Sequence, residues 1–133
     1  MDSRFHGNDD RVLRDLSMPV IDHSTQRMPA PTDKVGSRGM ITEEHGAESL
    51  SVREIVVEPG YRGRLHTHDT DEAVMVVEGS IQFIVGDEVR TVRSGYSMLA
   101  PPGVAHKLVN NTWVSARMLV IRPTTEQQAD YLE

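Results

Sequence analysis

The sequence contains no cysteine, which excludes disulfide bonds and thiolate ligands for a metal ion. It also lacks any apolar run near the ~18 residues that a membrane-spanning helix needs, so we expect no membrane partner. Residues 1–6 (MDSRFH) lack the apolar core of a signal peptide. Together these absences favour a cytoplasmic protein.

Positive charge is scarce as well, because 14 Lys and Arg residues face 20 Asp and Glu residues, for a formal net charge of -6. This balance argues against a nucleic-acid partner. With 133 residues the chain is long enough for one domain with a sizeable core. It leaves no spare length for a helix-turn-helix domain beside that core.

From residue 34 onwards the sequence predicts an all-β fold. Short runs rich in β-branched residues are separated by Gly, Pro and Asp, and Gly86-Asp87 has the composition of a hairpin turn. The expected strands cover residues 39–42, 50–57, 64–68, 72–77, 80–85, 88–93, 97–100, 106–109 and 114–121. Many short strands at such close spacing are typical of a sandwich or barrel.

The two ends of the chain differ from this pattern. Residues 1–34 have scattered apolar residues without a period, so we expect a poorly ordered N-terminal segment. Its stretch DSRFHGNDD (residues 2–10) resembles the translation of short repeats between bacterial genes, which makes Met18 an alternative start. The barrel is expected over residues 35–123. Residues 124–133 are expected to form a short helix, over 126–132, or a tail.

The most informative feature is the placement of three histidines and one glutamate. Residues i and i+2 of a strand point to the same side, so His66 and His68 can direct both imidazoles at one point. A polar turn follows, after which Glu72 can present its carboxylate to the same centre. His106 comes much later in the chain, and only a closed β architecture would bring it beside the others. These side chains are suitable ligands for a divalent metal.

The same residues lie in two spaced motifs. The first, G-(x)5-H-x-H-(x)3-E-(x)6-G, runs from Gly60 to Gly79, and the second, G-(x)5-P-x-G-(x)2-H-(x)3-N, runs from Gly95 to Asn110. Both resemble the signature motifs of the cupin superfamily, with every fixed position present. The resemblance implies an all-β fold, the cupin double-stranded β-helix or jelly-roll barrel. It also implies that His66, His68, Glu72 and His106 hold one metal ion inside the barrel. The glycines and Asn110 are interpreted as turn residues without a catalytic role.

Three neutral imidazoles and one carboxylate would leave a divalent ion with net positive charge, so it would remain a Lewis acid. On a six-coordinate ion, two positions stay open for water, oxygen or a bidentate substrate. Nitrogen and oxygen ligands of this kind suit Fe, Mn, Ni, Cu, Co or Zn, and ligand type alone does not choose among them. Glu72 is also the candidate catalytic residue, because it could leave the metal and act as a base.

Three classes of function follow, each with a small-molecule ligand. The first is a dioxygenase-like oxidoreductase that acts on a diketone, an enediol or an aromatic diol, as similar stand-alone cupins often do. The second is a non-redox isomerase, lyase, cyclase or decarboxylase, often for sugar acids, which would need a separate base. The third is a non-catalytic binding barrel. The absence of a further histidine near the motifs favours the first class.

Other candidates are less specific. Arg64 shares strand parity with the histidines and could bind an anion, although a solvated surface arginine is the better interpretation. Tyr61 could donate a hydrogen bond at the cavity mouth or pack at its rim. Four further residues could line a dry pocket but are more often simply core: Met75, Phe83, Met98 and Met118. The resemblance also implies a homodimer, formed through residues 50–57 and the segment before them.

Overall fold

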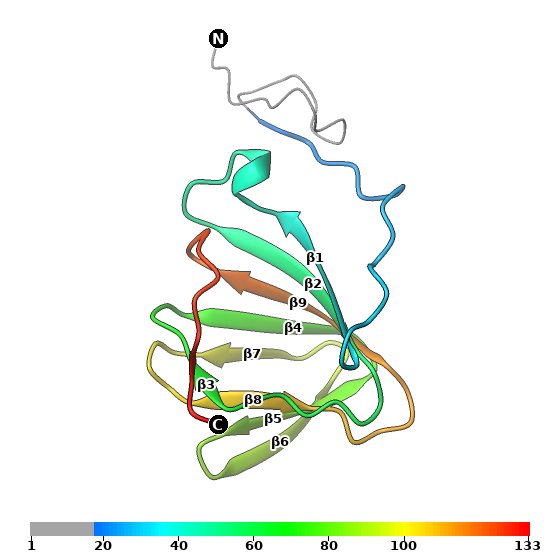
Figure 1. Cartoon of the computed structure of the whole chain (residues 1–133), viewed down its shortest axis with the longest axis vertical. Helices are drawn as coiled ribbons and strands as arrows, with labels where there is room; N and C mark the ends of the chain where they lie inside the picture. Colours follow the sequence, from blue (N-terminus) through cyan, green and yellow to red (C-terminus); the bar gives the residue numbers. More distant parts are fainter. Residues whose placement is uncertain (1–17) are drawn as a thin grey trace.

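The computed structural model describes residues 18–133, which form two antiparallel sheets of five strands each (Figure 1). Among these residues there is no α-helix, and none of them forms a helix able to cross a membrane. The elements are β1 (Val35–Ile41), η1 (Glu43–His45), β2 (Ser51–Val57), β3 (His66–Thr67), β4 (Glu72–Glu78), β5 (Ser80–Val85), β6 (Glu88–Arg93), β7 (Ser97–Ala100), β8 (His106–Val109), β9 (Ala116–Arg122) and β10 (Asp130–Tyr131).

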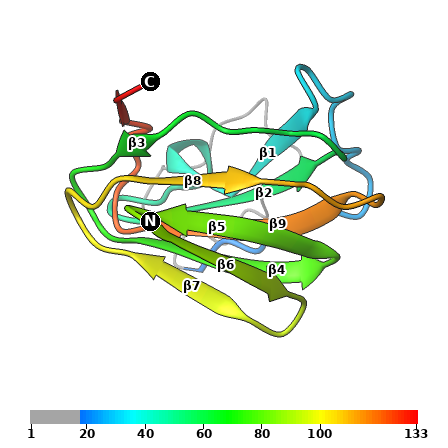
Figure 2. The same ribbon diagram turned by 90° about the horizontal axis from the view of Figure 1, so that it is seen from below.

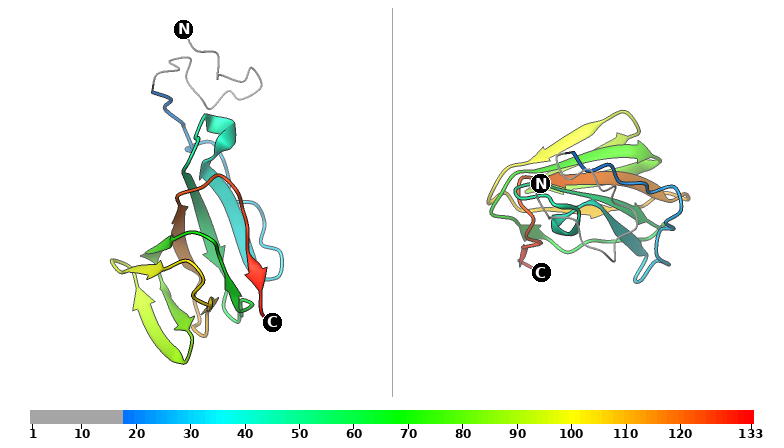
Figure 3. Two further views of the ribbon diagram at one scale, coloured as in Figure 1. Left: turned by 90° about the vertical axis from the view of Figure 1, so that its left-hand side faces the viewer. Right: turned by 90° about the horizontal axis from the view of Figure 1, so that it is seen from above.

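The predicted strands are present, and four of them, β5 to β8, begin and end at the predicted residues. Strand order is β1-β2-β9-β4-β7 in one sheet and β10-β3-β8-β5-β6 in the other. The two sheets face each other as layers (Figure 2). The 3-10 helix η1 and the β5–β6 hairpin lie at opposite ends of the molecule (Figure 3). The prediction of an all-β sandwich or barrel is therefore confirmed.

Strand alternation separates side chains that point into the barrel from those on the outer face. The interior itself has an apolar part and a polar part. Val74, Ile81 and Met118 are at most 1% exposed and pack in the apolar part, together with Phe83 and Met98. Phe83, Met98 and Met118 are therefore core residues, and Phe83 and Met98 also line an apolar hollow beside β5, β6 and β7. Met75 is 42% exposed and alternates with the buried Val74, so it lies on the outer face of its sheet and lines no interior pocket.

The helix expected over residues 126–132 does not form. The strand β10 lies there instead and pairs with β3, so that Tyr131 lies opposite His66. Leu132 N–H extends the pairing by donating to Leu65 O. A helix would need these backbone groups for its own hydrogen bonds, and the free edge of β3 competes successfully for them.

At the other end of the chain, residues 18–34 contain neither a helix nor one of the named strands. Met28 and Pro29 of this segment lie against Gly36 of β1. The expectations for residues 1–17, including the question whether Met18 is the start, lie outside the described residues.

Candidate metal centre

The three predicted histidines meet inside the barrel. His66 on β3 lies directly opposite His106 on β8, and their ring centroids are 4.5 Å apart. His68 follows β3 immediately, and its ring lies 4.8 Å from that of His66 and 5.3 Å from that of His106. One ring nitrogen of each histidine lies within 4.8 Å of the others. The three side chains could therefore hold a single metal ion.

Backbone carbonyls set the orientation of all three rings. Nδ1 of His66 is 2.7 Å from Arg64 O, Nδ1 of His68 is 2.5 Å from Gln128 O, and Nδ1 of His106 is 2.9 Å from Val104 O. We infer that each Nδ1–H donates to its carbonyl, so that with a metal bound the Nε2 of each ring would carry the lone pair that holds it. Histidines that ligate a metal are usually oriented by this kind of hydrogen bond.

Glu72, at the start of β4, faces this cluster from the opposite sheet. Its Oε2 lies 3.0 Å from His68 Nε2 and its Oε1 lies 3.2 Å from His106 Nε2. His68 Nε2 is fully buried and has no hydrogen-bond partner. With the proton on Nδ1, this nitrogen and the carboxylate oxygen are both electron-pair donors that face each other at 3.0 Å. Such a contact is repulsive unless a proton or a metal cation lies between the two atoms, so the residues fit a bound metal.

The site also perturbs the pKa values of its own groups. Burial is the largest effect and disfavours the ionised forms of Glu72 and His106, but their mutual hydrogen bond and the neighbouring charges together outweigh it, so the pKa of Glu72 is lowered and that of His106 is raised. Burial lowers the pKa of His66, and the neighbouring His106 and His68 add to this effect. Glu72 is therefore a carboxylate near neutral pH, the form that a metal requires.

Arg122 is a site residue that the sequence analysis missed. It is 6% exposed at the end of β9, and its Nη1 donates to Gln128 O at 3.0 Å, the same carbonyl that orients His68. Its Nη2 donates to Gln127 Oε1, and its Nε lies 3.9 Å from Glu72 Oε2. The available signal was strand alternation, because Ala116, Met118 and Val120 place Arg122 on the inner face of β9.

The histidines open onto a cavity of about 280 Å³ between the two sheets. Its walls come from β2, β3, β4, β8 and β9 and from residues 127–131, and Tyr61 lines it as the sequence analysis allowed. Arg64 does not line it. The Arg64 guanidinium lies 4.1 Å from the Tyr131 ring centre and donates to Glu133 O, so Arg64 is an exposed surface arginine.

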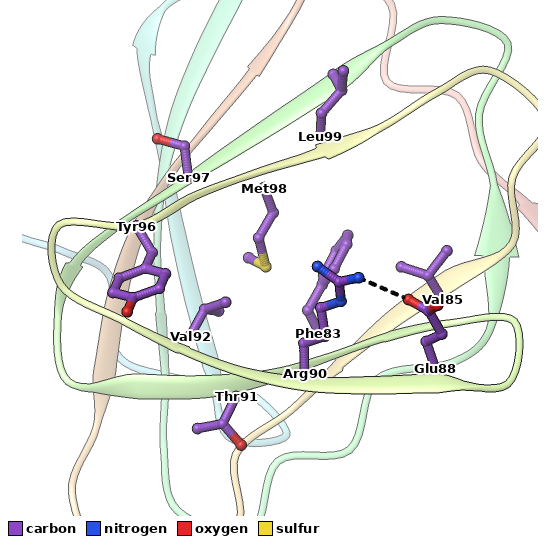
Figure 4. A pocket seen from close by; sticks show the side chains of 10 residues that line it. All are labelled: Phe83, Val85, Glu88, Arg90, Thr91, Val92, Tyr96, Ser97, Met98 and Leu99. Atoms are coloured by element: carbon purple, nitrogen blue, oxygen red, sulfur yellow. Dashed lines mark hydrogen bonds and ion pairs between the residues drawn. The ribbon is translucent and has the colours of Figure 1, made fainter.

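A second hollow, of about 640 Å³, lies between the β5–β6 hairpin and β7 (Figure 4). Phe83, Val92 and Met98 form much of its lining, and its charged residues are Glu88 and Arg90, an exposed ion pair at 3.2 Å. The Phe83 ring lies 5.9 Å from His106 and separates this hollow from the metal centre. Although it is larger, none of the described residues that line it belongs to a cluster of metal ligands, so we place the chemistry in the smaller cavity.

The fold and the histidine cluster together define a β-barrel protein with a candidate metal centre. The sequence matches the family model of the cupin domain over residues 53–122, and the chain therefore belongs to the cupin family. The jelly-roll fold implied by the two motifs is confirmed. None of the curated proteins matches the sequence significantly.

Several solved structures share the fold. The chain is 24% identical to the polyketide cyclase RemF from Streptomyces resistomycificus, with 75% of this chain and 72% of that chain covered and a TM-score of 0.70. A cupin-like protein from Thermotoga maritima is 22% identical, with 84% and 89% covered and a TM-score of 0.70. A sugar phosphate isomerase from Silicibacter pomeroyi is 26% identical, with 76% and 67% covered and a TM-score of 0.66. The names of these proteins cover different reactions, so the shared fold does not assign one.

Proposed function

We propose that the protein is a metal-dependent enzyme that acts on a small organic molecule. His66, His68, His106 and Glu72 would hold one divalent transition metal. The observation that carries this proposal is the buried Nε2 of His68, which has no hydrogen-bond partner and faces the Glu72 carboxylate at 3.0 Å. A bound metal would supply Lewis acidity toward an oxygen of the substrate and, if redox-active, electrons for oxygen chemistry.

The protein's own residues would bind and orient the substrate. Ile55, Leu108 and Val120 line the cavity with apolar surface, which limits the access of water. Burial, together with the nearby Tyr131, raises the pKa of the Tyr61 phenol. Tyr61 therefore stays protonated at neutral pH and can donate a hydrogen bond to a substrate oxygen.

We favour dioxygenase-like oxidation of a diketone, an enediol or an aromatic diol, with O2 as the second substrate. The support for this class is the lack of a dedicated base. Among residues 18–133, Glu72 is the only carboxylate that lines the cavity, and the three histidines there are the proposed ligands. An oxidation in which the metal lowers the pKa of the substrate hydroxyl makes little demand on a protein base.

A non-redox isomerase, lyase, cyclase or decarboxylase is the second candidate. The phenols of Tyr61 and Tyr131 both line the cavity and could return a proton to an enolate. The names of a cyclase and a sugar phosphate isomerase among the similar structures fit this class. Glu72 would then have to serve as the base.

Elemental analysis of protein purified without added metal tests the proposal. We expect one equivalent of metal in the wild type and in His23→Ala, a control that removes a histidine outside the cluster of His66, His68 and His106. We expect little in His106→Ala. Iron, copper, nickel or manganese together with oxygen uptake on diketones or diols would support the oxidative class, whereas stoichiometric zinc would favour the non-redox class. An absence of metal that persists on titration would overturn the proposal in favour of a binding barrel.

We also propose a homodimer, although the interface cannot be formed by backbone pairing between the β2 strands of two copies. β2 is an inner strand that pairs with β1 on one side and β9 on the other, so its backbone groups are already used. A better candidate is the outer face of the same sheet, where Met75 is 42% exposed and Leu99 is 61% exposed on neighbouring strands. Light scattering at micromolar concentration should give a dimer mass that Leu99→Asp reduces. A monomeric wild type would contradict the proposal.

A further inference from the structure

The cavity beside the histidines is positively charged in an otherwise acidic protein. Two guanidinium groups, those of Arg53 and Arg122, and a single carboxylate, that of Glu72, are its charged side chains, whereas the whole chain has a formal net charge of -6. A divalent metal would add to the positive excess. Charge of one sign inside a concave, poorly solvated site attracts ligands of the opposite sign.

Arg53 is the cavity cation with unused hydrogen-bond donors. It lies on the inner face of β2, opposite Val120 of β9, and is half-buried. Nε and Nη2 of Arg53 both donate to Ser37 Oγ, at 3.1 and 2.7 Å. Within residues 18–133 it forms no ion pair, and its Nη1 has no hydrogen-bond partner. The neutral Ser37 hydroxyl thus fixes the guanidinium without neutralising it.

The neighbouring arginines differ in this respect. On the outer face of the sheet, Arg38 pairs with Glu54 at 2.7 Å and Arg117 pairs with the same carboxylate at 3.5 Å. Inside the cavity, Arg122 is occupied by Gln127, Gln128 and the nearby Glu72. Holding a guanidinium half-buried without an anion is unfavourable, so a site that keeps one is suited to an anionic ligand.

We propose that the substrate is a small organic acid whose carboxylate is bound by Arg53, while an oxygen at its other end lies at the histidines. This inference deepens the proposed function and rests on it for the histidine end alone. A guanidinium matches a carboxylate in shape because it offers two parallel N–H donors. The cavity volume of about 280 Å³ limits the ligand to a short-chain acid. Arg53 is then the residue that selects acids over neutral molecules of the same shape.

Succinamate and its neutral amide, succinamide, provide a test because they have similar size and only succinamate carries a carboxylate. We would measure their dissociation constants by calorimetry on the apoprotein and on protein loaded with Zn2+, with metal content determined in each sample. The expected result is a preference for succinamate over succinamide of about tenfold, the value of one charge-assisted hydrogen bond. The preference should appear in the apoprotein, where chelation of a metal cannot produce it.

Three variants assign the preference to Arg53. Arg53→Gln should bind succinamate as weakly as succinamide, and Arg53→Lys should retain part of the preference because it keeps the charge. Arg90→Gln removes an equal charge from the exposed β6 strand outside the cavity and should behave as the wild type. Circular dichroism would establish that each variant is folded.

Two outcomes would overturn the inference. One is a wild type that binds the two probes equally, a comparison that needs no variant. The other is a preference that survives in a folded Arg53→Gln. If the protein takes up no Zn2+ but the apoprotein shows an Arg53-dependent preference, the organic acid is supported and the metal-dependent function fails. If Zn2+ binds and the preference is absent, the inference fails and the proposed function is unaffected.

Discussion

His66 and His106 are direct partners across the antiparallel pair of β3 and β8, and their rings lie 4.5 Å apart. The two side chains therefore point to the same side of one sheet, and strand register fixes their separation. Glu72 approaches them from the other sheet, with Oε1 3.2 Å from His106 Nε2. The candidate centre thus contains residues from both layers, so the site forms only when the two sheets pack together.

This arrangement predicts that the pKa values of the two histidines are shifted in opposite directions in the metal-free protein. Burial lowers the pKa of His66 below its ordinary value of 6.5. Burial also opposes ionisation of His106, but the hydrogen bond and charge of Glu72 and the hydrogen bond to Val104 together raise the pKa of His106 above 6.5. Ring-proton NMR of the apoprotein should show His106 titrating at the higher pH. Glu72→Gln should lower the pKa of His106, and Glu88→Gln, in the exposed hairpin, should leave it unchanged.

The sign of the effect on stability follows from these directions. A raised pKa in the folded state means that protonated His106 stabilises the fold fully below about pH 6.5, and this contribution is lost as the pH rises through the folded-state value. The lowered pKa of Glu72 has the opposite effect on the pH dependence of stability. Its contribution is present above the ordinary value of 4.5 and is lost as the pH falls through the folded-state value. His106 titrating below His66 would contradict this description.

Strand alternation and turn residues were sufficient to predict most of the fold. The boundaries of β5 to β7 follow from local sequence because Gly or Pro residues lie within two positions of each end, and Asn110-Asn111 follows the end of β8. The convergence of His66, His68 and His106 could also be predicted, from the two motifs. The sequence could not show that residues 126–132 would pair with β3. The unpaired edge of β3 to which they bind exists only once the rest of the sheet has formed.

For the same reason, the roles of Arg53 and Arg122 were not predicted. Arg53 is an inward-facing residue of β2, and Arg122 is one of β9. The sequences of these strands do not indicate whether the two side chains face the apolar core or the cavity. Their difference in function depends on partners distant in the chain, namely Ser37 for Arg53 and Gln127 and Gln128 for Arg122. Such partners are visible only in the folded protein.

Arg122 is predicted to be a large contributor to stability. Arg122→Met would keep much of the side-chain volume but remove the donors to Gln127 and Gln128 and the positive charge beside Glu72. Breaking a buried polar network of this kind should lower the free energy of unfolding by about 3 kcal/mol. Chemical denaturation would measure the loss. Arg90→Met removes an exposed ion pair and should cost less than about 1 kcal/mol. Equal effects of the two substitutions would refute the prediction.

Asn110 is predicted to be structural and not catalytic. Its side chain is fully buried, donates to the carbonyls of Val57 and Val114, and accepts from N–H and Oγ1 of Thr112. Asn110→Ala would leave these buried groups without partners and should destabilise the protein by about 2–3 kcal/mol. Metal content per folded molecule should not change. Loss of metal from a folded Asn110→Ala would show that this residue does more than hold the β8–β9 loop.

A comparison of alanine substitutions at Gly79 and Gly103 separates the energetic cost of an unfavourable backbone conformation from the cost of steric crowding. Their φ angles are nearly equal, +77° and +76°, in the left-handed region that disfavours a side chain. A Cβ at Gly79 would lie 2.6 Å from Ser115 O and 3.0 Å from the Cα of Ala116, whereas a Cβ at Gly103 would meet nothing within 4 Å.

Gly103→Ala should therefore cost only the conformational penalty of about 1 kcal/mol. Gly79→Ala should cost this amount plus the energy of moving the β8–β9 loop away from β4, and we expect a total of about 3 kcal/mol or more. Thermal and denaturant unfolding of the two variants would measure the difference. If Gly79→Ala is no less stable than Gly103→Ala, then the close approach of Ser115 to Gly79 does not constrain the turn between β4 and β5.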